Sequence, residues 1–148
     1  MNNRKKKVCL ITPNHISTNP RLVKEALALE QNGFSVHLIF TQSDSFETKM
    51  DYTILNQHPE WTFDALDWSG KNTRSYFFRF FSGAYKKVCE KVFLSTSVKR
   101  FSFGAVNRNL AWQIKKAVSA KADIYVAHNV GALPVARIAA RKTKAKFG

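Results

Sequence analysis

Polar residues that could contact a ligand follow a short apolar run near the end of the sequence. Ile124 to Ala127 is typical of a buried strand, so His128 and Asn129 emerge where that strand ends, and Gly131 follows them. The next helix would direct its free N–H groups to the same place, which favours phosphate or another anion. His128 is therefore a candidate functional residue, although a histidine at a strand end can equally cap a buried hydrogen bond. Asp123 starts the strand, roughly 16 Å from His128 across five strand residues, so we assign it a structural role.

A second candidate cluster lies in the loop from Pro13 to Asn19. This loop follows Val8 to Thr12, an apolar run typical of a strand that is covered on both faces in a parallel sheet. Ligands of such sheets bind beyond the carboxyl ends of the strands, which is where this loop lies. Its polar members are Asn14, His15, Ser17, Thr18 and Asn19.

The residues after this loop predict a strand–helix–strand unit. Asn19 offers a helix N-cap, and Pro20 suits the first helical position. Apolar residues then recur at helical spacing until Gly33 supplies the stop, and Phe34 to Phe40 is a second strand. Such a crossover is almost always right-handed. We therefore predict an α/β fold, Rossmann-like, with three α/β/α layers and a mostly parallel sheet.

The pattern is weaker in the middle of the chain. Thr41 to Met50 is polar and loop-like, Tyr52 to Leu55 is interpreted as a third strand, and Trp61 to Trp68 as a short element of undecided type. Ser75 to Phe93 is predicted to be a helix, with Phe77, Phe81, Ala84, Tyr85, Val88 and Val92 on one face. The remaining predicted elements are a helix over Ala105 to Lys121, a strand over Ala122 to His128, a helix over Ala132 to Lys144 and the start of a strand over Ala145 to Gly148.

The net charge of +14 on 148 residues is distributed unevenly. Between Lys71 and Arg108 lie nine Lys or Arg against one Glu, whereas six of the ten acids fall between Asp44 and Asp67. This asymmetry indicates an anionic partner such as membrane lipid, nucleic acid or a phosphorylated ligand, against the simpler interpretation of a solvated basic surface.

Several other classes of site find little support. Cys9 and Cys89 have no metal-ligand spacing and are interpreted as reduced structural thiols, and four scattered histidines form no metal signature. No G-x-G-x-x-G follows the first strand, which argues against dinucleotide binding. The apolar part of the amino terminus is too short for a signal peptide, so we expect a cytoplasmic protein.

Two segments together resemble glycosyltransferase family 4, whose members have the two-domain GT-B architecture. They are NPRLVKEALALEQNGFSVHLIF and ADIYVAHNVGALPVARIAARKTKAKFG, and with the opening strand and loop they cover about half of the chain, at its two ends. The resemblance is to the amino-terminal, acceptor-binding domain only. Because the chain stops just as a strand begins, we expect residues 1–148 to be that domain, with the carboxyl-terminal donor domain absent.

The resemblance implies a retaining glycosyltransferase that moves a sugar from a nucleotide-sugar donor to a glycan or lipid-linked acceptor in surface polysaccharide biosynthesis, without an essential metal or other cofactor. His128 matches the family's catalytic-cleft histidine, the loop from Pro13 to Asn19 matches the segment near acceptor and donor phosphate, and Arg21 matches a basic residue of the first helix. The loop lacks the paired glycines of many members, and Val126 replaces an additional histidine of some. One domain alone cannot position the donor and the acceptor against each other, so we expect this domain alone to be inactive.

Family members with lipid-linked acceptors often touch the membrane through a basic amphipathic part of this domain. The matching residues here are Arg74, Phe78, Arg79, Phe80, Lys86 and Lys87. They imply peripheral contact with the inner face of the cell membrane and a polyprenyl-linked acceptor, unless Phe77 and Phe81 simply pack into the core. The alternative function is a basic Rossmann-like module, without catalysis, that binds nucleic acid or another anionic partner; no nucleic-acid motif supports it.

Overall fold

The computed structural model describes residues 4–96 and 98–148. A five-stranded, fully parallel sheet has the strand order β3-β2-β1-β4-β5. Its strands are β1 (Lys7–Ile11), β2 (Ser35–Gln42), β3 (Thr62–Asp67), β4 (Ile124–Ala127) and β5 (Lys146–Phe147). The helices are α1 (Pro20–Gln31), α2 (Ser45–Gln57), α3 (Thr73–Thr96), α4 (Lys99–Val106), α5 (Leu110–Ala120) and α6 (Leu133–Thr143), with a short 3-10 turn at Val130–Ala132. The predicted Rossmann-like α/β fold is confirmed.

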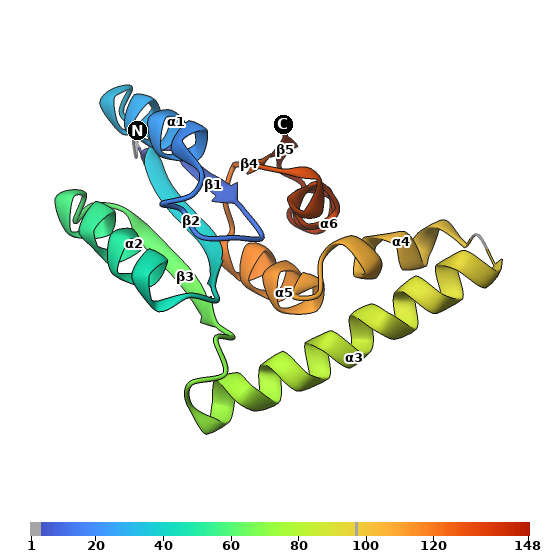
Figure 1. Cartoon of the computed structure of the whole chain (residues 1–148). Coiled ribbons are helices and arrows are strands. Elements are labelled where there is room, and N and C mark those ends of the chain that lie inside the picture. The colour runs from blue at the N-terminus through green and yellow to red at the C-terminus, as the bar shows by residue number, and fades with distance from the viewer. Residues whose placement is uncertain (1–3, 97) are drawn as a thin grey trace.

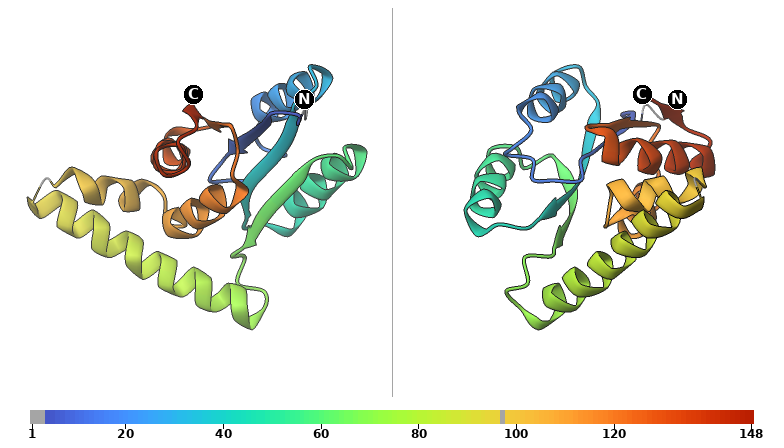
Figure 2. Two further views of the ribbon diagram at one scale, coloured as in Figure 1. Left: turned by 180° about the vertical axis from the view of Figure 1, so that it is seen from behind. Right: turned by 45° about the vertical axis from the view of Figure 1, so that its right-hand side comes forward.

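Helices cover both faces of the sheet, as Figures 1 and 2 show. The alternation of side chains along β1 explains the two layers. Val8 and Leu10 pack with α1 and α2, whereas Cys9 and Ile11 pack with α5 and α6. Burial raises the pKa of the Cys9 thiol, which fits its assignment as a structural residue. Asp123 is also structural, because it accepts hydrogen bonds from the Lys7 N–H at 2.7 Å and from Arg4.

The structure corrects the elements that were predicted between residues 41 and 68. Tyr52 to Leu55 is not a strand but part of α2, and so is much of the predicted loop before it. Asp44 caps this helix by accepting hydrogen bonds from the N–H groups of Phe46 and Glu47, a signal that the polar composition concealed. Trp61 to Trp68 contains the third strand, β3, instead.

The prediction for α3 was wrong about its buried face. The helix is present and slightly longer than Ser75 to Phe93, but Ser75, Ser82 and Cys89 are its buried residues. Phe77 and Phe81, which were predicted for the core face, are 54% and 65% exposed. The reason is that α3 leaves the sheet and pairs mainly with α4, as Figure 1 shows.

The two helices come very close to each other at Gly104. A Cβ at this position would lie 2.5 Å from the Cys89 sulfur, so only a residue without a side chain fits. The single helix predicted over Ala105 to Lys121 is in fact the end of α4 and all of α5, separated at Asn107 to Asn109. Among the described residues, no helix combines the length and apolar character needed to cross a membrane.

Candidate ligand-binding crevice

The candidate site lies where the strand order reverses. β1 and β4 are neighbours in the sheet, but the chain proceeds from β1 in one direction and from β4 in the other. In open parallel sheets ligands bind at this switch point, outside the carboxyl ends of the strands. A cavity of about 480 Å³ lies there. It is lined by Pro13, Asn14, Lys86, Val106, Asn107, Arg108, Asn109, Asn129, Val130 and Gly131.

A buried chain of side-chain amides holds the walls of this crevice together. Gln113 Nε2 donates to the Thr12 carbonyl oxygen at 2.7 Å, and Asn107 Nδ2 donates to Gln113 Oε1 at 2.7 Å. The same Asn107 nitrogen donates to the Gly131 carbonyl oxygen at 2.8 Å. These bonds tie the end of β1, the α4–α5 junction and the turn after β4 to one another. Asn107 and Gln113 were missed from the sequence because they fall inside what reads as one continuous helix.

The turn after β4 has an unusual backbone. Asn129 has φ 77°, a region that most side chains avoid, and it is one of the residues that line the crevice. Gly131 is buried, and a Cβ there would lie 3.3 Å from the Pro13 ring, so the loops after β1 and β4 are in close contact. Of the residues predicted for ligand binding, Asn14, Asn129 and Gly131 therefore share one cavity.

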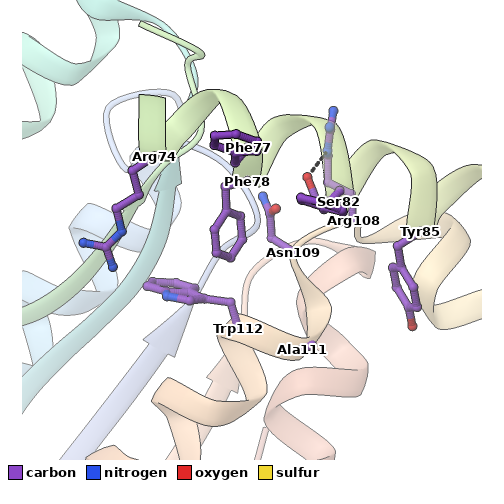
Figure 3. Close-up of a pocket in the computed structure, with 10 residues that line it drawn as sticks. Arg74, Phe77, Phe78, Ser82, Tyr85, Arg108, Asn109, Ala111 and Trp112 are labelled. Carbon is purple, nitrogen blue, oxygen red and sulfur yellow. Dashed lines mark hydrogen bonds between the residues drawn. The ribbon is translucent and has the colours of Figure 1, made fainter. Parts of the chain in front are cut away.

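Two cations line the crevice as well. Arg108 is held in place: its Nε donates to Ser82 Oγ at 3.1 Å (Figure 3). Its guanidinium lies 4.3 Å from the centre of the Trp68 ring. Burial lowers the pKa of Arg108, and the nearby charge of Arg79 lowers it further. No carboxylate forms an ion pair with Arg108 among the residues that the structure describes. Lys86, which was predicted for membrane or anion contact, has Glu90 at 3.5 Å.

The other predicted membrane-contact residues are spread over α3. Arg74 and Phe78 line a separate apolar cavity between α3 and α5 (Figure 3), while Phe80 is 62% exposed and Lys87 is exposed. Arg79 donates to the Ser69 carbonyl oxygen at 2.8 Å and is otherwise exposed.

His128 does not line the crevice. Its backbone N–H donates to the Ile11 carbonyl oxygen at 2.8 Å, and its side chain is turned toward α1. There Nε2 lies 2.9 Å from Glu25 Oε2, at an ion-pair distance but without the alignment of a hydrogen bond. The imidazole side chain is 12% exposed. The catalytic role predicted for His128 stays a prediction.

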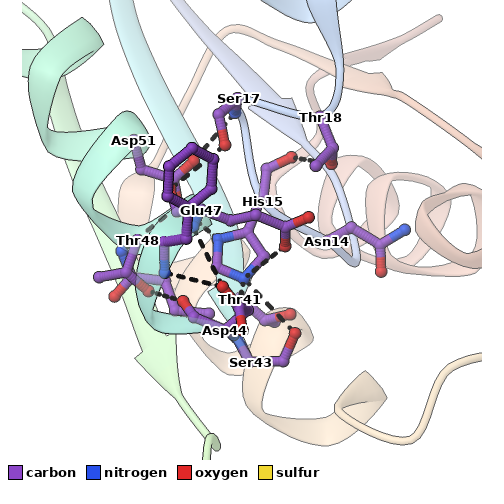
Figure 4. A network of polar contacts seen from close by, with 12 residues as sticks. Asn14, His15, Ser17, Thr18, Thr41, Ser43, Asp44, Glu47, Thr48 and Asp51 are labelled. Carbon is purple, nitrogen blue, oxygen red and sulfur yellow. Dashed lines mark hydrogen bonds and ion pairs between the residues drawn. The ribbon is translucent and has the colours of Figure 1, made fainter.

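His15 belongs to a buried polar network that joins the loop after β1 to α2 (Figure 4). Its Nε2 accepts hydrogen bonds from the N–H groups of Ser43 at 2.8 Å and Asp44 at 3.2 Å. The neutral ring therefore carries its proton on Nδ1, which donates to the fully buried Asp51 at 2.7 Å. In this form, the approach of Glu47 to 3.4 Å from Nε2 is no ion pair. His15 thus has structural partners on both ring nitrogens.

The remaining predicted loop residues also have local partners. Ser17 donates its N–H to Asp51 at 2.9 Å, and Thr18 Oγ1 donates to the His15 carbonyl oxygen at 3.0 Å. Asn19 caps α1 as expected, accepting from the Leu22 N–H at 3.2 Å, and Arg21 is exposed on the first turn. None of these four lines the crevice. Within residues 4–96 and 98–148, no group of three or more metal-ligating side chains is assembled.

Comparison with known proteins gives a likeness of structure but not of sequence. No protein-family model and no curated protein matches the chain. The crystal structure of TcCGT1 in complex with UDP matches with a TM-score of 0.57 and 15% identity, over 97% of this chain and 28% of that one. The structure of LpCGTa in complex with UDP matches with a TM-score of 0.43, 10% identity and 84% and 30% coverage. A predicted subunit of tRNA methyltransferase from Methanocaldococcus jannaschii matches with a TM-score of 0.48, 9% identity and 97% and 66% coverage.

The last two likenesses are too weak to carry an argument. The likeness to TcCGT1 concerns the fold alone, and this chain spans less than a third of that protein's length. The chain therefore has a glycosyltransferase-like α/β fold.

Proposed function

We propose that this chain is the acceptor-binding half of a GT-B glycosyltransferase of the family 4 type. The observation that carries the proposal is the polar, cationic crevice at the β1–β4 switch point of a glycosyltransferase-like fold. In the full-length protein a second domain would hold the nucleotide-sugar donor opposite this crevice. TcCGT1, which shares the fold, was crystallised with UDP, which supports a nucleotide-sugar donor.

The crevice has the chemistry to bind a sugar and a phosphate. Carboxamides of Asn14 and Asn129 can donate to and accept from sugar hydroxyls, and Lys86 and Arg108 can neutralise a phosphate. We propose an acceptor that carries both groups, as a glycan linked to a lipid phosphate does. The reaction would retain the anomeric configuration and would need no metal ion. For His128 to face the reacting sugar, its ring would have to turn from α1, where Nε2 lies 2.9 Å from Glu25 Oε2, toward the crevice.

We also propose that α3 rests on an anionic membrane surface. Tyr76, Phe77, Phe80 and Phe81 are each more than half exposed, and they lie on the same helix as the exposed cations Arg74, Lys87 and Lys91. Aromatic side chains beside Lys and Arg are typical of helices that lie in a membrane interface. Sedimentation with vesicles of an anionic lipid tests this: we expect binding at low salt that weakens at high salt, and absence of binding at either salt concentration would contradict it.

The alternative of a nucleic-acid-binding module is not favoured. Among the described residues, the aromatic side chains that are more than half exposed lie on helices, not on a sheet surface where bases could stack. They are Phe46 on α2 and Tyr76, Phe77, Phe80 and Phe81 on α3.

A transfer assay with the full-length natural protein tests the proposed function. A panel of labelled nucleotide sugars would be offered with a lipid extract as acceptor. Asn129→Gly is the informative variant, because glycine accepts the positive φ while the carboxamide is lost. We expect transfer by the natural protein and at least tenfold slower transfer by Asn129→Gly, with Gln31→Ala on the exposed end of α1 as the control. Absence of transfer from every donor would contradict the proposal.

A further inference from the structure

A second cavity lies beside the crevice, between α3 and α5. It has a volume of about 510 Å³. Figure 3 shows Phe78 and Trp112 directed into the space between the two helices. The cavity is lined by Arg74, Phe77, Phe78, Phe81, Ser82, Tyr85, Arg108, Asn109, Ala111 and Trp112. Five of these ten residues are aromatic, so the cavity suits an apolar group.

The apolar cavity and the polar crevice are neighbours that share two lining residues. Arg108 and Asn109 line both. A ligand that extends past these two residues would therefore place one end among amides and cations and the other end among aromatic rings.

Asn109 has an unused hydrogen-bond acceptor at this junction. Its side chain is buried, and Oδ1 has no hydrogen-bond partner among the described residues. Buried polar atoms in folded proteins nearly always have partners, so this oxygen indicates a missing donor such as a hydroxyl group of a ligand.

The charge at the two cavities is of one sign. Arg74, Lys86 and Arg108 are the ionisable Lys and Arg side chains in the two linings, and no Asp or Glu of the described residues lines either cavity. The charged part of a complementary ligand is therefore an anion.

We propose that the two cavities together bind one amphiphilic molecule, a phosphate ester of a long aliphatic alcohol. Its phosphate lies between Lys86 and Arg108, a hydroxyl-bearing group donates to Asn109, and the aliphatic chain enters the apolar cavity. This ligand would be the acceptor of the proposed glycosyltransferase, so its role as a substrate rests on the proposed function. The binding itself does not depend on sugar transfer.

Tryptophan fluorescence reports on this site. Trp112 lines the apolar cavity and Trp68 lies against Arg108, whereas Trp61 is buried elsewhere and stacks on His58. The chain would be titrated with inorganic phosphate, octyl phosphate and decyl phosphate, each below its micelle concentration. We expect each added methylene to tighten binding about fourfold, so decyl phosphate binds roughly 16-fold more tightly than octyl phosphate.

Variants separate the two ends of the ligand. Ala111 is exposed at the cavity edge, so Ala111→Phe should fold normally, as circular dichroism would verify, and fill the cavity. We expect this variant to bind decyl phosphate at least tenfold more weakly and to bind inorganic phosphate with unchanged affinity. Arg108→Gln should weaken both. The matched controls are Ala28→Phe on α1 and Arg141→Gln on α6, both at exposed positions. Neither control should change the affinity for decyl phosphate or for inorganic phosphate.

Geranyl phosphate has the same number of carbons as decyl phosphate, so comparing the two shows whether the cavity prefers an isoprenoid or a straight chain. Tighter binding of either one supports the proposal. Equal affinity for octyl and decyl phosphate, no effect of Ala111→Phe, or binding to anionic vesicles without binding to either monomeric phosphate would overturn it. If decyl phosphate fails to bind while the full-length protein transfers sugar, only this inference falls. If it binds and no sugar is transferred, only the proposed function falls.

Discussion

Gln113 should be the side chain on which the shape of the crevice depends most. Replacing it with Leu keeps most of the volume but removes the donor to Thr12 and the acceptor for Asn107. Thr12 is fully buried, Gln113 is fully buried, and Asn107 is 3% exposed, so water cannot easily replace the lost partners. The Thr12 carbonyl oxygen would lose its side-chain donor, and Asn107 Nδ2 would keep its bond to Gly131 but have one N–H left over. Each buried donor or acceptor without a partner costs about 1–3 kcal/mol, so the two together cost about 2–6 kcal/mol. Whole domains are stable by about 5–15 kcal/mol, so the loss should be large.

The free energy of unfolding of Gln113→Leu would be measured by urea titration, with circular dichroism as the signal. The control is Gln57→Leu at the exposed end of α2, where the side chain has no buried partner to lose. We expect the control to lie within about 0.5 kcal/mol of the natural protein. A loss for Gln113→Leu no larger than that of the control would refute the view that the amide chain is satisfied and buried.

Three further changes test other parts of the fold. Burial, and secondly the charge of Lys7, lower the pKa of His37 from 6.5 to about 4, so the unfolded chain takes up a proton at this residue first. The contribution of His37 to stability should therefore be complete above pH 6.5 and be lost as the pH falls toward 4, by about 3 kcal/mol in all. Urea titrations from pH 4 to 7 should show this slope in the natural protein and a shallower one in His37→Gln, and equal slopes would contradict it. Gly104→Ala should lower stability by about 1–3 kcal/mol and increase amide exchange in α3, because the added Cβ meets Cys89 and Tyr85; unchanged exchange would show that the helices can separate freely. Asn19→Ala should cost about 1 kcal/mol and Asn19→Ser much less, since Asn19 caps α1; equal losses in thermal unfolding would contradict a capping role.

The strongly patterned parts of the chain were predictable from the sequence. β1 and β2 have apolar runs, and α1 has apolar residues at helical spacing between an N-cap at Asn19 and a stop at Gly33. All three elements were placed within a few residues. The β4 segment was equally clear, and with it the position of Asn129 and Gly131 at the crevice. In these segments the local pattern and the tertiary environment agree.

The prediction failed where tertiary contacts override the local pattern. The aromatic face of α3 resembles a core face, but the helix buries Ser75, Ser82 and Cys89 instead, because it pairs mainly with α4 and not with the sheet. His15 resembled a ligand-binding residue because of its place in the loop. Only the fold shows that α2 supplies Asp51 as its partner. The amide chain of Asn107 and Gln113 joins residues that are up to 101 positions apart, which no local pattern could reveal.

Amide chemical shifts of the isotope-labelled chain, recorded during titration with decyl phosphate, would show where an acceptor-like ligand binds. We predict shifts concentrated at Asn14, at residues 107–109 and at residues 129–131, where the crevice lies, and extending along the side of α3 that faces α5. The basic runs at residues 4–7 and 141–146 provide the internal comparison, because they carry as much charge without either cavity. Shifts that are confined to those runs would contradict a ligand site at the β1–β4 switch point.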